Sequence, residues 1–259
     1  MSTDPYAAPK SRVADTRSGS ESFVPEGRSV AAGNGWAWVT DAWGLVKQNL
    51  GAWIVLFIIC VVIVIVLSFI PLLGALALYV VTPIFMGGVM LGCEAVRKGE
   101  PMTVAHLFAG FGSNAGKLAG VGLFTLVAYI GIFVVVMAIF GFSIARMFMG
   151  GMNDPAAVAE MGLTILLAVL IVFALSIPIY MAMWFSYPLI VLNDYSVGQA
   201  LKASFSACLK NIVPFLVYGI VMFVLAIVAS IPLLLGWLLL GPVLLASLYT
   251  GYRDIFYTA

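Results

Sequence analysis

The sequence alternates long uncharged stretches with short charged ones. Asp, Glu, Lys and Arg are absent from residues 48–93, 118–145, 161–193 and 211–252, which are 46, 28, 33 and 42 residues long. A helix needs about 20 apolar residues to cross a hydrocarbon layer of about 30 Å. The two longest stretches can therefore each hold two spans and the two shorter ones a single span, which predicts six transmembrane helices.

Proline and glycine divide the two longest stretches. Pro71 and Gly74 interrupt the first, and Pro232 and Gly236 interrupt the last, as is usual where a chain turns. The connections are short, so each of these stretches is expected to form a tight helical hairpin. The predicted spans are 50–70, 72–93, 118–141, 163–192, 213–231 and 234–252.

An amphipathic segment precedes each odd-numbered span. Before the first, apolar residues recur every three or four positions, the period of one helix face: Trp36, Val39, Trp43, Val46 and Leu50. A similar pattern follows Thr103, and another follows Ser196, where Gln199 has the spacing of a capping box. Amphipathic helices beside spans are typical of the membrane interface.

These segments belong to an internal repeat. Each unit has an interfacial helix, then an Asn close to a Lys, and then two spans; the Asn residues are Asn49, Asn114 and Asn211. Two spans per unit give every unit the same orientation, as in parallel repeats. The sequence thus predicts an all-α membrane bundle of three parallel hairpin repeats over residues 36–256. Residues 1–35, with few large apolar side chains, are expected to be a disordered cytoplasmic tail.

Composition and charge agree with a membrane protein and give its orientation. Hydrophobic residues make up 63% of the chain and charged residues 9%, against roughly 45–50% and 25% in soluble domains. With both termini in the cytoplasm, 11 of the 12 basic residues lie on the cytoplasmic side and only Arg146 lies outside. The net charge of +1 indicates no nucleic-acid partner. The expected partners are the lipid bilayer and other membrane proteins.

The residues that usually carry chemistry are scarce. There is one histidine, His106, and the spacing of Cys60, Cys93 and Cys208 fits neither a zinc site nor a redox pair. We therefore expect no catalytic, cofactor-binding or metal-binding residues, and no enzyme. The spans also lack the ionisable residues that mark ion and proton paths. This argues against a proton-coupled pump and leaves open a pore or a carrier for apolar or lipid substrates.

Prolines inside the even-numbered spans are candidate helix hinges. Proline removes a hydrogen bond from the helix ladder, and it does so at Pro83, Pro188 and Pro242. Each could simply kink its helix. Alternatively, each could mark a hinge where freed carbonyl groups line a cavity.

Charged residues at the predicted cytoplasmic helix ends suggest a ring. Carboxylates at helix C-termini are unfavourable by about 0.3–1 kcal/mol each, so three of them suggest basic partners. The acids are Glu94, Asp194 and Asp254, and the bases that begin the odd spans are Lys47, Lys117 and Lys210. The alternative is simple solvation at the level of the lipid headgroups.

One run of residues resembles a known group of proteins. It comprises Tyr187-Pro188-Leu189-Ile190-Val191, Asp194, Ala200-Leu201-Lys202, Ser204 and Asn211. It is similar to a poorly characterised group of bacterial six-helix inner-membrane proteins, which is itself similar to the membrane domain fused to some glycerophosphodiester phosphodiesterases. The resemblance covers roughly residues 36–256. It implies an all-helical domain in a bacterial inner membrane, and it carries over no catalytic residue.

Two hypotheses for the function follow. The first is a non-catalytic accessory, scaffolding or lipid-associated role. The alternative is a transporter or channel for a small or lipid-like substrate. A scaffold should be a tightly packed bundle, whereas a transporter should have a polar-lined cavity between its repeats.

Overall fold

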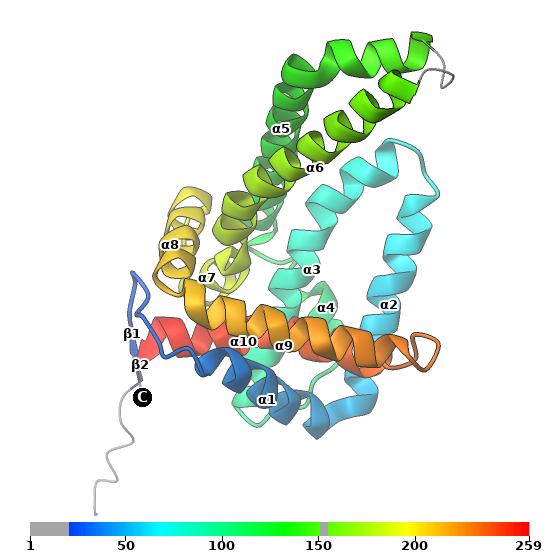
Figure 1. The fold of residues 1–259 in the computed structure, drawn as a ribbon. Helices are drawn as coiled ribbons and strands as arrows, with labels where there is room; N and C mark the ends of the chain where they lie inside the picture. The colour runs from blue at the N-terminus through cyan, green and yellow to red at the C-terminus, as the bar shows by residue number, and fades with distance from the viewer. Residues whose placement is uncertain (1–20, 151–154, 259) are drawn as a thin grey trace, which may run out of the picture.

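The computed structural model describes residues 21–150 and 155–258, and nearly all of them are helical (Figure 1). A single two-stranded sheet joins the N-terminal segment to the C-terminal one within this part of the chain. In chain order the elements are β1 (Ser22–Phe23), α1 (Asn34–Val46), η1 (Lys47–Asn49), α2 (Leu50–Ser68), α3 (Leu73–Arg97), α4 (Ala105–Ala109), α5 (Ala115–Gly150), α6 (Pro155–Trp184), α7 (Ser186–Asn193), α8 (Val197–Lys210), α9 (Ile212–Ser230), α10 (Trp237–Phe256) and β2 (Tyr257–Thr258).

Five helical stretches of the described residues are long and apolar enough to cross a membrane. They are Asn34–Ser68, Leu73–Arg97, Ala115–Arg146, Glu160–Asn193 and Ile212–Ser230. They overlap the first five predicted spans, with ends that differ by one or two residues where the predicted span extends beyond the stretch. The first stretch also includes α1, and Figure 1 shows α2 turning away from α1 after the short η1.

The sixth predicted span, 234–252, falls on α10, which differs from the other helices. Most of its residues are buried, including the bulky Tyr249, Tyr252 and Phe256. A helix enclosed by protein does not need a lipid-compatible surface, so it can carry tyrosine, Arg253 and Asp254 near its end. For the same reason its composition alone does not mark it as a membrane span.

The core of the protein lies around α10. Helix α1 packs along α10 and α9, while α2 and α3 contact α10 from other sides. The buried aromatic side chains of Trp38, Phe185 and Phe256 meet there, and the Phe185 and Phe256 rings lie 5.7 Å apart. The buried face of α1 carries Trp38 rather than Trp36 and Trp43, which stay exposed. The predicted amphipathic helix is thus present, with part of its tryptophan content facing outward.

The short amphipathic helices follow a cyclic pattern of contacts. Helix α4 packs on α3, and α8 packs on α6 and α7. Helix α1, at the start of the chain, packs on α10 at its end. Helices α4 and α8 therefore contact the helices that precede them in the chain, and the contact of α1 with α10 closes the cycle.

Glycine allows two of these contacts to be very close. A Cβ on Gly88 would lie 2.4 Å from the carbonyl oxygen of His106, which tightens the α3–α4 contact. A Cβ on Gly35 would lie 2.2 Å from the Pro214 carbonyl oxygen, between α1 and α9. Any larger residue at either position would push the helices apart.

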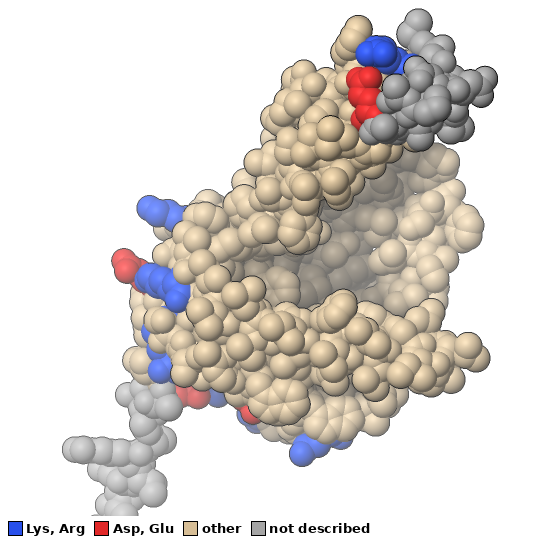
Figure 2. Space-filling model, viewed as in Figure 1, with Lys and Arg blue, Asp and Glu red and all other residues tan. Residues whose placement is uncertain are grey.

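The helices separate toward the ends that lie far from the chain termini. Figure 1 shows α2 with α3, α5 with α6, and α9 with α10 extending in diverging directions. Figure 2 shows a hollow between them, walled by uncharged residues, while charged side chains gather mainly near the opposite ends. Large apolar side chains are exposed on these diverging helices, among them Phe173 and Ile177 of α6 and Ile65 of α2. Such a surface suits a hydrocarbon surrounding.

The N-terminal segment from residue 21 is an ordered part of the fold. Strand β1 pairs antiparallel with β2, with Ser22 opposite Thr258. Beyond the strand, the Val24 N–H donates to the Phe256 carbonyl at 2.8 Å, and the Arg28 N–H donates to the Ile255 carbonyl at 2.9 Å. The prediction of a disordered tail over 1–35 is therefore wrong for residues 21–33, because backbone hydrogen bonds hold this polar stretch in place. Residues 1–20 lie outside the described part.

Candidate functional site

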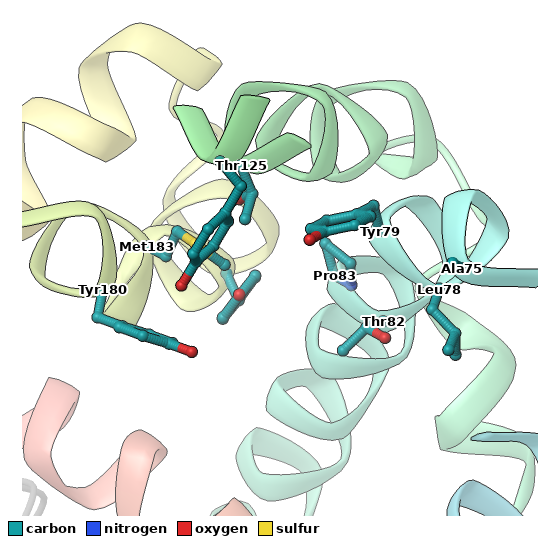
Figure 3. Close-up of a pocket in the computed structure, with 10 residues that line it drawn as sticks. Ala75, Leu78, Tyr79, Thr82, Pro83, Thr125, Tyr180 and Met183 are labelled. Carbon is teal, nitrogen blue, oxygen red and sulfur yellow. The ribbon is translucent and has the colours of Figure 1, made fainter. Parts of the chain in front are cut away.

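A cavity of about 420 Å³ lies where α3, α5, α6 and α7 meet. Its walls carry hydroxyl groups, although these helices are otherwise mostly apolar. It is lined by Ala75, Leu78, Tyr79, Thr82 and Pro83 of α3, Thr125 and Tyr129 of α5, Tyr180 and Met183 of α6, and Tyr187 of α7 (Figure 3). We call it the tyrosine cavity.

Close packing of α3 against α5 positions one wall of the tyrosine cavity. A Cβ on Gly122 would lie 1.9 Å from the Tyr79 carbonyl oxygen and 3.3 Å from the Pro83 ring. Glycine thus lets α5 touch the backbone of α3 beside the two lining residues. Pro83 lies inside α3 and is buried. Because proline has no N–H, the helix ladder is weaker at this wall.

The polar side chains of the tyrosine cavity come from facing helices. The Tyr79 and Tyr129 rings, on α3 and α5, have centroids 6.4 Å apart. In Figure 3 the hydroxyl groups of Tyr79 and Tyr180 point toward one another from opposite walls. Tyr180 is 56% exposed, so its ring lies at the open side of the tyrosine cavity.

Thr125 lies in the interior of the tyrosine cavity, where its hydroxyl is held by neighbouring groups. It is only 6% exposed. Its hydroxyl donates to the Val121 carbonyl at 2.9 Å and lies 2.9 Å from the Met183 sulfur. Because a hydroxyl can also accept hydrogen bonds, Thr125 still offers an acceptor to a bound molecule. The walls combine hydroxyl groups with apolar surface, as is typical of small-molecule sites.

Sequence reasoning did not find the tyrosine cavity. Its residues come from four helices and form no local motif. A signal was present, because hydroxyl-bearing residues recur at helical spacing in the middle of otherwise apolar spans. Tyr79 and Thr82 are three residues apart on α3, and Thr125 and Tyr129 are four apart on α5.

The structure brings together one of the predicted acid–base pairs. The Lys117 ammonium group, at the start of α5, lies 2.5 Å from the Asp194 carboxylate that follows α7. The other two acids have different partners. Asp254 pairs with Arg28 of the N-terminal segment at 3.1 Å, and Glu94 pairs with Arg97 of its own helix at 2.7 Å.

The two remaining lysines of the predicted ring do not meet its acids. Lys210 donates to the Glu26 carbonyl at 3.0 Å and to the Gly27 carbonyl at 3.2 Å. Lys47, at the end of α1, has an exposed side chain, and we find no ion pair for it within residues 21–150 and 155–258. A continuous ring of these six residues stays a prediction.

The charges near the termini instead form a local network around Glu21. Its carboxylate accepts a hydrogen bond from the Arg253 guanidinium and lies 3.4 Å from the Arg97 guanidinium. The hydrogen bond from Arg253 holds the pKa of Glu21 below its ordinary value. The Arg253 guanidinium also lies 3.8 Å from the centre of the Tyr257 ring, a cation–π contact. This network ties the N-terminal segment to α3 and α10.

The three candidate hinge prolines differ in their surroundings. Pro83 and Pro242 lie inside the continuous helices α3 and α10. Near Pro188 the helix is interrupted at Phe185, since α6 ends at Trp184 and α7 begins at Ser186. The Ser204 hydroxyl of α8 enters this interruption. It accepts from the Phe185 N–H at 2.9 Å and donates to the Met181 carbonyl at 2.7 Å.

The described residues contain no group of three or more His, Cys, Asp or Glu side chains that could hold a metal ion. Two comparisons with known proteins are negative: no family model matches the chain, and no solved structure matches it. A search of curated proteins finds a probable inner membrane protein of Burkholderia thailandensis. It is 30% identical over 212 residues, which cover 78% of this chain and 76% of the relative.

The chain belongs to the family of this inner membrane protein. Together with the five apolar helices, the relative identifies a multi-pass protein of the bacterial inner membrane. The comparisons provide no link to glycerophosphodiester phosphodiesterases, so that part of the resemblance stays a prediction.

Proposed function

We propose that this protein has a non-catalytic, lipid-associated role and binds a lipid-like molecule in the tyrosine cavity. One observation carries the proposal: hydroxyl-bearing side chains line a cavity in the middle of otherwise apolar helices. Polar groups within a membrane are costly, so a set of them that faces one cavity supports a binding site there. Exposed apolar residues of α6, such as Phe173 and Ile177, provide a hydrocarbon surface next to the cavity.

A lipid should therefore remain bound to the purified protein, and filling the cavity should remove it. Thr125→Phe adds a ring to the cavity interior, and Ala75→Phe adds one at its wall. Ala174→Phe, on an exposed part of α6, is the matched control. Native mass spectrometry should find bound lipid in the wild type and the control, and much less in the two filled variants. Equal lipid in all four proteins would contradict the proposal.

The proposed topology has six spans, with α10 as the sixth and both termini in the cytoplasm. Pairing of β1 with β2 supports it, because the segments before the first span and after α10 meet on one side. A chain whose two ends lie on the same side of the membrane crosses it an even number of times. Because α9 is the fifth span, α10 would be the sixth and would bring the chain back to the starting side. The cyclic packing of α1, α4 and α8 supports three parallel hairpin repeats.

The orientation can be tested with a thiol reagent that does not cross membranes. A cysteine in place of Glu160, near the tip of α6, should react in intact cells, and one in place of Lys98 should not. The unsubstituted protein is the control, since Cys60 is half-buried and Cys93 and Cys208 are buried. The reverse pattern would contradict cytoplasmic termini.

Transport of the bound molecule is the second candidate function. It is favoured by the position of the tyrosine cavity between α3 of the first proposed repeat and α5 and α6 of the second. The two candidates differ in one measurement. In liposomes with a fluorescent lipid in one leaflet, a transporter should move the lipid to the other leaflet, and Thr125→Phe should stop it. A lipid-associated protein should bind the lipid and leave it in place.

A further inference from the structure

The charge of the lining residues limits which molecules the tyrosine cavity can accept. None of its ten lining residues is Asp, Glu, Lys, Arg or His. Along α5 the nearest charged residues are Lys117, eight residues before Thr125, and Arg146, seventeen residues after Tyr129. At 1.5 Å per residue these lie roughly 12 Å and 25 Å away along the helix. On α3 the nearest is Glu94, eleven residues after Pro83, roughly 16 Å along the axis.

A charged head group would be poorly accommodated in this position. It would lose its hydration in the hydrocarbon layer and would find no counterion on the walls. Burial of an ion without a partner is among the most unfavourable events in protein chemistry. Phosphate-bearing lipids are normally held by Arg or Lys, which the lining does not supply.

The hydroxyl groups suit an uncharged polar group instead. A tyrosine or threonine hydroxyl both donates and accepts, so it can bind an alcohol, an ester or a ketone. Tyr79 and Tyr180 offer hydroxyl groups from opposite walls (Figure 3), and Tyr129, which is hydrogen-bonded to Tyr180, adds a third. Leu78, Pro83 and Met183 provide apolar surface beside them.

We infer that the ligand of the tyrosine cavity is a neutral amphiphile, with an uncharged hydroxyl or carbonyl head and an apolar chain. This inference rests on the proposed lipid-binding function and names its ligand class. It separates diacylglycerols, isoprenoid alcohols and quinones from the phosphate-bearing lipids that form most of a bacterial membrane.

A matched pair of lipids tests the ligand class. Dioleoylglycerol and dioleoylphosphatidic acid carry the same two chains and differ only in the phosphate. Each is titrated into the purified full-length protein in detergent, and native mass spectrometry gives the two dissociation constants. We expect dioleoylglycerol to bind at least tenfold more tightly. Tyr79→Phe and Tyr180→Phe each remove one cavity hydroxyl, and each should weaken the binding of dioleoylglycerol by about 2- to 10-fold.

Two variants keep the two proposals separable. In Thr82→Lys an ammonium group enters the wall, and the preference should shift toward dioleoylphosphatidic acid. Thr125→Phe should weaken the binding of both lipids. If the wild type prefers the phosphatidic acid, or binds both equally, while Thr125→Phe still abolishes binding, the lipid site stands and the neutral class is wrong. If Thr125→Phe changes neither affinity, the tyrosine cavity is not the lipid site, and both proposals fail.

Discussion

The N-terminal segment and the tyrosine cavity are two polar regions of one apolar protein, and they use their polar groups differently. Where residues 21–33 meet the start of α9 and the end of α10, polar groups are paired with one another. Asn211 there is fully buried and makes three hydrogen bonds to backbone groups. In the tyrosine cavity, the Tyr79 hydroxyl faces the cavity, and the Tyr180 hydroxyl is paired with the hydroxyl of Tyr129, another lining residue. We call the first region the terminal junction.

The difference separates a role in stability from a role in binding. A buried polar group that is fully paired contributes to folding and is costly to disturb. A polar group that faces a cavity gives little to folding, and its presence is better explained by a ligand. Removing a paired side-chain group should therefore reduce stability strongly at the terminal junction, whereas removing a tyrosine hydroxyl that faces the tyrosine cavity should reduce it little.

The largest loss of stability is expected for Asn211→Leu. The Asn211 side chain accepts from the Val30 N–H at 2.8 Å and donates to the carbonyl groups of Arg28, at 2.9 Å, and Ala207, at 2.8 Å. Leucine would leave these backbone groups without their partner, at roughly 1–3 kcal/mol for each group that stays unpaired. The free energy of unfolding in detergent should fall by about 3–5 kcal/mol.

Asn114→Leu is the control for this substitution. Asn114 is the corresponding Asn of the second predicted repeat, beside Lys117, but it is only half-buried. Its loss should change the free energy of unfolding by less than about 1 kcal/mol. Similar losses in both variants would mean that burial at the terminal junction has no special role.

A smaller loss is expected for Ser204→Ala. The hydroxyl connects the Phe185 N–H and the Met181 carbonyl, which would bond directly to each other in an unbroken helix. Without this hydroxyl, the Phe185 N–H and the Met181 carbonyl must either bond to each other or stay unpaired. The free energy of unfolding should fall by about 1–2 kcal/mol. Ser206→Ala on the same helix is the control, and an equal effect there would contradict the role assigned to Ser204.

The sequence predicts the helices well, because each span is defined by its own composition. The predicted 50–70 and 213–231 match α2 (Leu50–Ser68) and α9 (Ile212–Ser230) closely. Gln199 also accepts a hydrogen bond from the Ser196 N–H at 3.1 Å, as the capping-box spacing predicts. These are local features, set within a few residues along the chain.

The features that sequence reasoning missed depend on contacts between distant residues. The docking of residues 21–33 relies on Asn211, which binds Val30 from 181 positions away, and on Asp254, which binds Arg28 from 226 positions away. The helix interruption at Phe185 involves a hydroxyl group from α8, that of Ser204, which bonds to Phe185 and Met181. The tyrosine cavity forms only once α3, α5 and α6 converge. Apolar helices in lipid have few local signals for their partners, since nearly every face is hydrophobic.

Acid should weaken the terminal junction slightly through Glu21. The pKa of this carboxyl lies below its ordinary value of 4.5 because Arg253 donates to it. Its contribution to stability is thus complete above about pH 4.5 and is lost as the pH falls through the lower folded value. Glu21 is largely exposed, so the contribution is at most about 1 kcal/mol. The stability difference between wild type and Glu21→Gln should be constant from pH 6 to 8 and shrink below pH 4.5.

The smallest change in stability is expected for Tyr79→Phe and Tyr180→Phe in the tyrosine cavity. Each removes one oxygen that faces the cavity and leaves the ring in place. The free energy of unfolding without ligand should change by no more than about 0.5 kcal/mol for Tyr79→Phe, and by at most about 1 kcal/mol for Tyr180→Phe, which also loses a hydrogen bond to Tyr129. Tyr218→Phe is the matched control. That tyrosine is buried, and its hydroxyl lies 2.8 Å from the Ser247 hydroxyl, so its loss should cost roughly 1–2 kcal/mol.

Added dioleoylglycerol should raise the melting temperature of the wild type and Tyr218→Phe by similar amounts and that of the two cavity variants by less, because ligand stabilisation follows affinity. If the cavity variants were as unstable as Tyr218→Phe without ligand, the hydroxyl groups of Tyr79 and Tyr180 would serve folding, and the contrast with the terminal junction would not hold.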